Sequence, residues 1–356
     1  MSLRSLVIAA VATAAIVFTP NSVGSQQSPT PFGTTVDVSR ILTEVRVVSF
    51  DGEPVLGLEP EDFRVMVDGQ PAEVRSVLWI PSTSDAAASS QTSAVAEGPS
   101  SQAQPVAEGR TIVILFQIDF GLRVSRTEGL LRMSPRAAEF VENLGPDDRV
   151  ALLSFGSHLR LHSDFTSDHE AMAEMLGTVN ILEAGGEPPA PAPPLLGEHL
   201  DPEAARKAAD LSTALELIGQ ALREFPGTKS LVLFGYGLGS MSAGWRITID
   251  DGYNRAMTAL TQSRTSVFSL DLTDADYHSL EVGLRAVSED TGGFFVRTHI
   301  FPDVAIDRLA RVISSYYELE IIPPPDLEDD FIIKVKVNRP RVDIYVRQYN
   351  SSHYGW

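Results

Sequence analysis

The sequence predicts an α/β fold, with a doubly wound and mostly parallel sheet, joined to a smaller all-β sandwich. Two observations carry this prediction. Within residues 110–315, short apolar runs alternate with segments that have helical periodicity and helix caps. In residues 36–80 and 316–349, apolar and polar residues alternate with a period of two, as in half-buried strands. Neither β segment is large enough alone, so we expect both to build one sandwich into which the α/β domain is inserted.

The first 25 residues are expected to be a cleaved secretory signal peptide. Arg4 precedes an apolar run at residues 6–18, and residues 23–25 (VGS) are small, as a signal peptidase requires. A membrane anchor is the less favoured alternative, because a span needs roughly 20 apolar residues. We therefore expect a secreted or periplasmic protein with no integral membrane segment after cleavage.

Composition excludes several classes of function. The chain has no cysteine, which excludes disulfides, thiolate zinc sites and cysteine nucleophiles. Its formal net charge is −19, and such a field repels nucleic acids and anionic lipids. We therefore expect no nucleic-acid partner, and we attribute the acidity mainly to solubility.

Turn signals organise the first β segment. Asp51-Gly52 and Asp68-Gly69 each stand between alternating runs, and Asp-Gly favours the tight turn of a β-hairpin. Residues 81–109 follow and consist mostly of Ala, Ser, Gln, Pro and Glu. A segment of this composition buries too little apolar surface to order itself, so we expect a disordered linker.

The α/β region offers strands that are apolar throughout and helices with recognisable ends. Strands buried on both faces are expected at residues 111–118, 149–155, 229–235 and 265–270. The expected helices run from Ser134-Pro135 to about Leu144, from a capping box of Ser167 and Glu170, from Asp201-Pro202 to Arg223, over 278–290 before Thr291-Gly292-Gly293, and over 303–315. Asp119 directly follows the first strand, at the edge where such sheets bind ligands.

Several segments together carry a family resemblance. They include DGEPVLGLEPEDFRVMVDGQPAEV, TIVILFQID, GPDDRVALLSFGS, STALELIGQAL, TKSLVLFGYG and SVFSLDL. In this order they resemble the bacterial von Willebrand factor A-related domain family, over roughly residues 36 to 350. The resemblance implies an exported protein with an A-type α/β domain and a flanking β domain. It also implies a protein partner, which members of the wider fold often bind through a divalent metal ion.

The resemblance implies a metal-ion-dependent adhesion site that is degenerate here. The family uses an Asp-x-Ser-x-Ser loop after the first strand, a threonine from a second loop and an aspartate after the fourth strand. Asp119 matches the first aspartate, but Gly121 and Arg123 stand at the two serine positions. Tyr236 stands at the second aspartate, and the threonine loop reads Gly185-Gly186-Glu187. The implied partner-binding surface is Asp119, Gly121, Arg123, Gly186, Glu187 and Tyr236.

Metal binding at this site is the alternative hypothesis to metal-free binding of a partner. Mg²⁺ needs six oxygen ligands, whereas Asp119 supplies one carboxylate beside the positive charge of Arg123. We therefore expect no cofactor, with Arg123 or a helix amino terminus compensating the carboxylate. The alternative is a Mg²⁺- or Ca²⁺-dependent adhesion domain in which Asp119 holds the ion through water.

Two further groups of residues each allow a metal-binding interpretation and a purely structural one. His158, His162, Asp164 and Asp168 could bind a transition metal, or could line a solvated edge strand. Asp271, Asp274 and Asp276 could bind calcium, or could cap a helix.

Glycine- and proline-rich segments complete the candidates. Gly235, Gly237 and Gly239 could form a phosphate loop, although a merely flexible loop is favoured. The insertion at 187–200 is rich in proline, and we expect its 188–194 part to be extended polyproline near the carboxyl edge of the sheet, over the site or presenting a partner surface.

The sequence therefore favours an exported, non-enzymatic protein-binding or adhesion-type module. Its partner would be a protein or the cell envelope. A secreted hydrolase is a further alternative, but Tyr236 stands where a nucleophile elbow would need serine, and the sequence singles out none of the seven histidines as a catalytic base.

Overall fold

The computed structural model describes residues 40–81, 109–118, 124–177, 188–241, 247–249, 252–325, 327 and 330–351, all within one compact unit that spans residues 39–356. The strands are β1 Ile41–Ser49, β2 Phe63–Val67, β3 Gln70–Pro81, β4 Thr111–Gln117, β5 Arg149–Phe155, β6 Leu159–Thr166, β7 Lys229–Gly235, β8 Ser240–Met241, β9 Ile247–Thr248, β10 Thr265–Asp271, β11 Phe295–Arg297, β12 Ser315–Ile322, β13 Asp330–Val337, β14 Val342–Val346 and β15 Tyr349–Ser351. The helices are η1 Pro60–Asp62, α2 Val124–Glu142, α3 His169–Gly177, η3 Leu196–Glu198, α4 Pro202–Lys207, α5 Leu211–Leu222, α6 Tyr253–Gln262, α7 Glu281–Thr291 and α8 Pro302–Val312.

The α/β region is built on a six-stranded sheet with the order β11-β10-β7-β4-β5-β6. All of its neighbouring pairs are parallel except β5 with β6. The order reverses between β4 and β7, where the chain starts at β4, winds outwards through β5 and β6, and returns to β7. The predicted doubly wound, mostly parallel sheet is thereby confirmed, and its switch point lies between β4 and β7.

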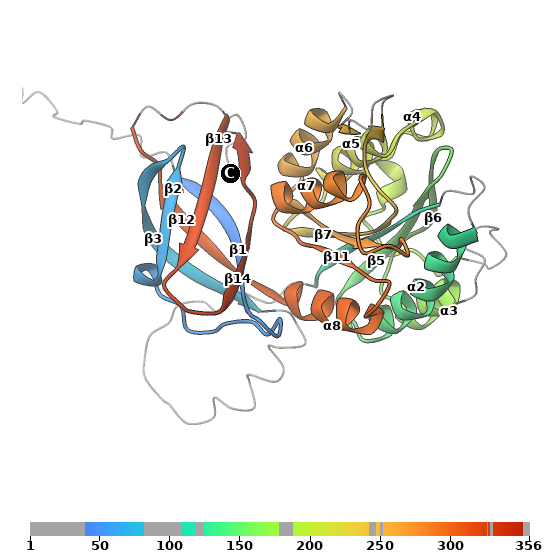
Figure 1. Ribbon diagram of the computed structural model, residues 1–356, viewed down its shortest axis with the longest axis horizontal. Helices are drawn as coiled ribbons and strands as arrows, with labels where there is room; N and C mark the ends of the chain where they lie inside the picture. Colours follow the sequence, from blue (N-terminus) through green and yellow to red (C-terminus); the bar gives the residue numbers. More distant parts are fainter. Residues whose placement is uncertain are drawn as a thin grey trace, which may run out of the picture. The chain divides into compact units, whose positions relative to one another are not determined.

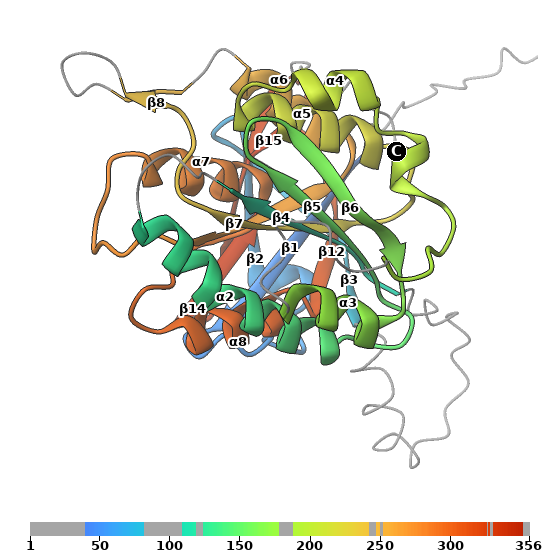
Figure 2. The same ribbon diagram turned by 90° about the vertical axis from the view of Figure 1, so that its right-hand side faces the viewer.

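Helices cover both faces of this sheet (Figure 2). One apolar core lies under α2, α3 and α8, and the other under α4, α5, α6 and α7. The central strands β4 and β7 are buried on both faces, which explains why their sequences are apolar rather than alternating. None of the helices in the described ranges has the length and hydropathy needed to cross a membrane.

The all-β part is a seven-stranded sheet with the order β14-β1-β12-β3-β2-β13-β15. Figure 1 shows its strands from the two ends of the chain side by side, blue beside red, as the antiparallel pairing of β1 with β12 requires. Strand β3 pairs with β12 along residues 73–81 and with β2 along 70–72, so it bends from one half of the sheet into the other. The two halves enclose a separate apolar core. Both β segments thus contribute to one all-β unit, as predicted.

The predicted hairpin turn at Asp68-Gly69 and the predicted helix end at Gly292 are confirmed. Asp68 and Gly69 both have positive φ, +48° and +78°, in the hairpin between β2 and β3. Gly292 ends α7 in the left-handed conformation with φ +80°. A side chain on Gly292 would also meet the backbone N of Arg347 at 2.7 Å, so both conformation and space require glycine there.

The predicted start of the first helix of the α/β region, at Ser134-Pro135, is wrong. Helix α2 begins ten residues earlier in the chain, at Val124, and Pro135 lies inside it. Buried Leu130, Met133, Ala137 and Val141 keep one apolar face continuous through the proline. This packing outweighs the backbone hydrogen bond that proline cannot make.

Two other helix predictions are also corrected. The amino terminus of α3 is capped by Asp168, whose Oδ1 accepts from the N–H of Ala171 at 3.1 Å, and not by Ser167. The long helix expected from Asp201 to Arg223 is broken into α4 and α5. Asp210 causes the second start, because its carboxylate accepts from both the N–H (2.7 Å) and the hydroxyl (3.0 Å) of Thr213.

A buried charged cluster lies where β1 and β12 approach the amino ends of β7 and β10. Glu44, Arg46, Lys229 and Arg347 are buried members of the cluster, and Arg264 and Glu318 are partly exposed members. Arg264 forms ion pairs with Glu44 at 2.9 Å and Glu318 at 3.3 Å. The cluster contains more cations than carboxylates, and burial together with the neighbouring arginines lowers the pKa of Lys229 to about 8.

Candidate functional site at the carboxyl edge of the six-stranded sheet

The switch point between β4 and β7 is closed by the side chain of Gln117. Gln117 is the last residue of β4, and its Oε1 accepts from the N–H of Tyr236 at 2.7 Å and of Gly237 at 3.2 Å. Its Nε2 donates to the carbonyl of Gly237 at 3.1 Å. The amide thus ties the ends of the two strands together at the position where doubly wound sheets usually bind ligands.

Tyr236 is the one predicted site residue within the described part of the chain. It is 4% exposed and belongs to the apolar core under α2 and α8. The position where the resembled family has a second aspartate therefore contributes a buried ring instead of a carboxylate. Asp119, Gly121, Arg123, Gly186 and Glu187 lie outside the described residues.

The glycines around Tyr236 are explained by close packing. Gly237 and Gly239 have φ of +151° and +100°. A Cβ on Gly237 would meet the Cβ of Leu280 at 2.4 Å, and one on Gly239 would meet the carbonyl of Thr248 at 2.9 Å. The segment needs glycine for its own backbone path, so the glycine pattern requires no phosphate.

Asp271, His278 and Glu281 are the one group in the described residues whose ligand atoms are close enough to share a metal ion, within 4.8 Å of one another. Protein groups already satisfy Asp271. Its Oδ1 accepts from the N–H and hydroxyl of Thr273 at 3.0 and 2.8 Å, and its Oδ2 lies 2.8 Å from Nε2 of His278.

Glu281 is held in the same way by arginine. Arg297 donates to its two oxygens from Nε at 2.9 Å and from Nη2 at 2.6 Å, and Arg285 approaches at 3.5 Å. Burial alone would raise the pKa of Glu281, but the two arginines lower it below its ordinary value. A cation on this group would have to displace Arg297, so we interpret the group as an internal ion-pair network.

Asp271, which ends β10, and Asp274 and Asp276, which follow it, contact different partners. Asp271 bonds Thr273 and His278, Asp274 pairs with Arg132 at 2.6 Å, and Asp276 pairs with His299 at 3.0 Å. They do not converge on one ion. The helix-capping role is wrong as well, because the amino terminus of α7 has no side-chain cap.

The four residues that could have bound a transition metal likewise contact separate partners. His158 bonds Ser157 and Arg160, whereas His162 Nε2 lies 2.7 Å from the hydroxyl of Ser154. Asp164 accepts from the N–H groups of Leu196 and Gly197, and Asp168 caps α3. Each side chain has a local structural role.

Ser154 and His162 form a pair that the sequence did not predict, because β5 and β6 bring them together across the strands. Burial, and then the charge of Arg160, lower the pKa of His162 below its usual value, which favours the neutral imidazole. Ser154 is only 4% exposed. No described carboxylate bonds His162, so the pair lacks the orienting group of a catalytic triad.

The proline-rich insertion lies elsewhere than predicted. The carbonyl of Ala190 accepts from the Thr166 hydroxyl at 2.9 Å, the N–H of Ala192 donates to Phe165 at 2.6 Å, and the Pro193 carbonyl accepts from Arg149 at 3.4 Å. Arg149 begins β5, so this part of the insertion lies at the amino end of the parallel strands and not at the carboxyl edge. It covers the outer strand β6, which would otherwise expose unpaired backbone groups.

Exposed apolar side chains gather at the carboxyl edge. We call Tyr277, Ile300, Phe301 and Val304 the apolar rim; they are exposed by 65%, 57%, 66% and 62%. His299 Nε2 lies 3.0 Å from Oδ1 of Asp276, so the loop after β10 and the segment before α8, which carry the rim, are in contact. Figure 2 places both segments on the same side of the sheet as the start of α2. This rim was not predicted from the sequence, although the adjacent apolar residues Ile300 and Phe301, just before the helix expected at 303–315, indicated it.

Comparisons with known proteins give likenesses of fold. No family model matches the chain, and no curated protein matches it. Similar solved structures include a von Willebrand factor type A protein from Catenulispora acidiphila (8% identity, 89% of this chain and 74% of that chain, TM-score 0.40) and BatB from Bacteroides thetaiotaomicron (14%, 58% and 98%, 0.37). Proximal thread matrix protein 1 from the mussel byssus matches at 11% identity, with a TM-score of 0.38. That match covers 58% of this chain and only 47% of the mussel protein. The strand order and the two helix layers are those of a von Willebrand factor A-like fold.

Proposed function

We propose that the protein is an exported, non-enzymatic binding module that engages a protein partner through the carboxyl edge of its six-stranded sheet. The observation that carries the proposal is the apolar rim. Four large apolar side chains, including two aromatic ones, are exposed on the loop after β10, on the segment before α8 and in the first turn of α8. Exposed patches of this kind are typical of interaction sites, and aromatic anchors contribute a large share of binding energy at interfaces.

The proposal is for binding without a metal ion. The Gln117 amide binds the backbone that follows β7, and Tyr236 contributes a buried ring instead of a carboxylate. The carboxylates of Asp271 and Glu281 are engaged by protein donors. Association would therefore rest on apolar burial at the rim, with Asp276 and Asp303 as charged neighbours that are 91% and 73% exposed.

Export and the absence of catalysis are parts of the same proposal. Residues 1–25 have the pattern of a secretory signal. Ser154 and His162 come nearest to a nucleophile with its base, and they lack an orienting carboxylate among the described residues.

The test is quantitative affinity capture from the exported protein fraction of the source organism. Wild type is compared with Phe301→Asp and with the control Phe50→Asp. Phe50 is 79% exposed in the turn after β1, so both variants exchange an exposed aromatic ring for a charge. A partner retained by wild type and by the Phe50 variant but lost by the Phe301 variant supports the proposal. Equal retention by all three proteins refutes it.

A further inference from the structure

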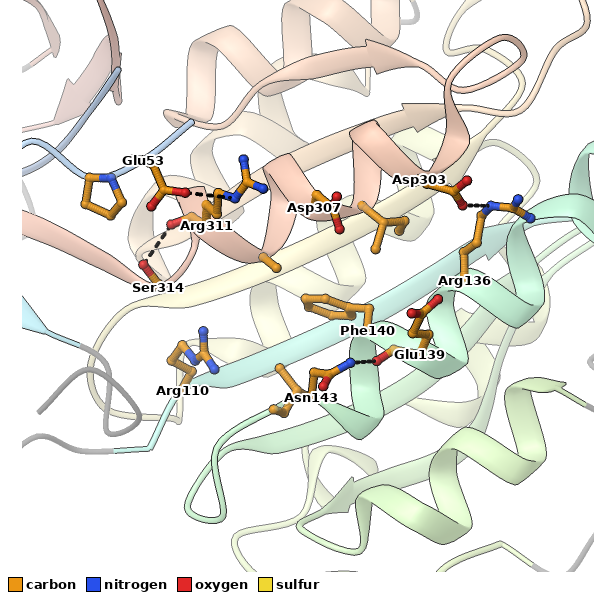
Figure 3. A pocket seen from close by; sticks show the side chains of 14 residues that line it. Glu53, Arg110, Arg136, Glu139, Phe140, Asn143, Asp303, Asp307, Arg311 and Ser314 are labelled. Atoms are coloured by element: carbon orange, nitrogen blue, oxygen red, sulfur yellow. Dashed lines mark hydrogen bonds and ion pairs between the residues drawn. The ribbon is translucent and has the colours of Figure 1, made fainter. Parts of the chain in front are cut away.

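A groove lies between α2 and α8, and none of the four residues of the apolar rim lines it. It has a volume of about 580 Å³ and runs past Arg110 at the amino end of β4, Pro54 and the carboxyl end of α8. Its apolar lining comes from Phe140 and Leu144 of the α2 region and from Ile306 and Ala310 of α8 (Figure 3). This volume falls within the ordinary range of ligand pockets.

The arginines that line the groove are already neutralised. Arg110 is held by the wholly buried carboxylate of Asp148, with Nε 3.1 and 3.0 Å from its two oxygens. The other two arginines also form ion pairs. Arg136 pairs with Asp303 at 2.5 Å, and Arg311 pairs with Glu53 at 3.1 Å. An anionic ligand would have to break these pairs, so the groove does not suit one despite its three arginines.

Two carboxylates remain uncompensated. Glu139 projects from α2 and Asp307 from α8, and both line the groove and are exposed. Figure 3 shows Glu139 on α2, next to Phe140 of the same helix, and Asp307 on α8. Neither forms an ion pair with any residue in the described ranges, so the groove presents two negative charges above an apolar floor.

We infer that this groove binds a positively charged segment of a protein partner, with a lysine or arginine received by Glu139 and Asp307 and an apolar side chain on the floor beside Phe140. Charge complementarity favours a positively charged occupant, because both free charges of the groove are negative and the formal net charge of the whole chain is −19. Because the carboxylates are open to water, they contribute mainly specificity and association rate, while the floor supplies apolar burial. The inference does not depend on the rim, so either site can fail without the other.

The probe is a pair of short synthetic peptides with the same apolar residues, one flanked by lysines and the other by glutamates. Binding to the whole protein is measured by fluorescence anisotropy. We compare wild type, the double variant Glu139→Gln/Asp307→Asn, and the control Glu128→Gln/Glu142→Gln. The control removes two exposed carboxylates of α2 that do not line the groove, so its net charge changes by the same amount.

The lysine peptide is expected to bind wild type and the control within about twofold of each other, and the groove variant about tenfold more weakly, with affinity falling as salt is raised. The glutamate peptide is expected not to bind. Equal weakening in the control would mean that only the overall charge matters and would overturn the inference. Binding of the glutamate peptide, or no binding of the lysine peptide at millimolar concentration, would overturn it as well. Thermal melting of each variant checks that the fold is intact.

Discussion

The Oε1 atom of Gln117 accepts a hydrogen bond of 2.7 Å from the backbone N–H of Tyr236, across the switch point of the six-stranded sheet. The same oxygen accepts from Gly237, and the amide nitrogen donates to the Gly237 carbonyl. One side chain thus satisfies three backbone groups that β7 leaves without a strand partner. In this chain the usual ligand position of the fold is used to hold the sheet together.

Replacing Gln117 by leucine should therefore destabilise the protein. Leucine keeps much of the volume but leaves the N–H groups of Tyr236 and Gly237 without an acceptor, which should cost about 1–3 kcal/mol. The free energy of unfolding from urea denaturation measures the effect. Gln220→Leu on the exposed side of α5 is the control and should change little. A Gln117 variant as stable as wild type would mean that water replaces the amide.

Removing the buried carboxylate of Asp148 should have a larger effect. Asp148 accepts from the backbone N–H of Arg110 and of Gly145, both at 2.7 Å, and from the Arg110 side chain. Asp148→Ala leaves a partly buried arginine without its partner and should cost about 3–5 kcal/mol. Glu203→Ala, which breaks an exposed pair with Lys207, should cost well under about 1 kcal/mol. Chemical denaturation compares the two, and similar losses would contradict this account of Arg110.

Stability should rise with pH above neutrality because of Lys229. Burial, followed by repulsion from Arg264 and Arg347, lowers the pKa of Lys229 from 10.5 to about 8. Between these two values the unfolded chain binds the proton and the folded chain does not, so the free energy of unfolding increases with pH in that window. The gain between pH 7 and 9.5 should be about 2 kcal/mol.

Urea denaturation at several pH values measures this gain, and Lys229→Met should abolish it. Lys336→Met, on an exposed position of β13, should keep it. A flat profile for wild type would show that Lys229 keeps an ordinary pKa, for instance because the two carbonyls that its Nζ contacts, those of Gly227 and Ser263, hold the proton.

The apolar rim should matter little for folding. Phe301 and Tyr277 are mostly exposed, so Phe301→Asp and Tyr277→Ser should change the free energy of unfolding by less than about 0.5 kcal/mol. Gly283→Ala gives the contrast, because its new Cβ would lie 2.2 Å from the carbonyl of Leu238. That variant should be destabilised by about 1–3 kcal/mol. A large loss in the rim variants would instead assign them a structural role.

We expect the protein to show no specific binding of divalent metal ions. Titration calorimetry with Mg²⁺, Mn²⁺ and Ca²⁺ is expected to give no saturable heat, because Asp271 and Glu281 are occupied by protein donors and Tyr236 offers no carboxylate. Asp119→Ala and Asp271→Asn distinguish the two places where an ion could bind. Saturable binding that disappears in Asp119→Ala would establish the Mg²⁺-dependent alternative in place of metal-free binding.

The architecture was predictable because it follows from the apolar pattern. Strands such as Thr111–Gln117 are apolar throughout, and only burial on both faces explains that. The turn at Asp68-Gly69 and the helix end at Gly292 depend on local backbone sterics, which one or two residues determine. Helix starts were less predictable. Pro135 has a strong local preference for a first turn, but the apolar face of α2 passes through it, and tertiary packing outweighed the local signal.

The site was much less predictable, because its contacts join residues far apart in sequence. Gln117 is an ordinary residue in a strand until β7 is placed beside β4. Ser154 and His162 meet only through the pairing of β5 with β6, and the insertion after α3 covers β6 although its sequence says nothing about which edge it reaches. Of the residues chosen by resemblance, Tyr236 alone is in the described part of the chain, and its burial follows from its apolar ring.

Site-specific photo-crosslinking tests the central claim most directly. A benzophenone amino acid is placed at position 301 in the apolar rim and, as control, at position 50, and each protein is irradiated with the exported protein fraction in the presence of EDTA. We predict a discrete covalent adduct from position 301 and none from position 50. An adduct that forms equally from both positions, or that forms at position 301 only when Mg²⁺ replaces EDTA, would contradict metal-independent binding through the rim.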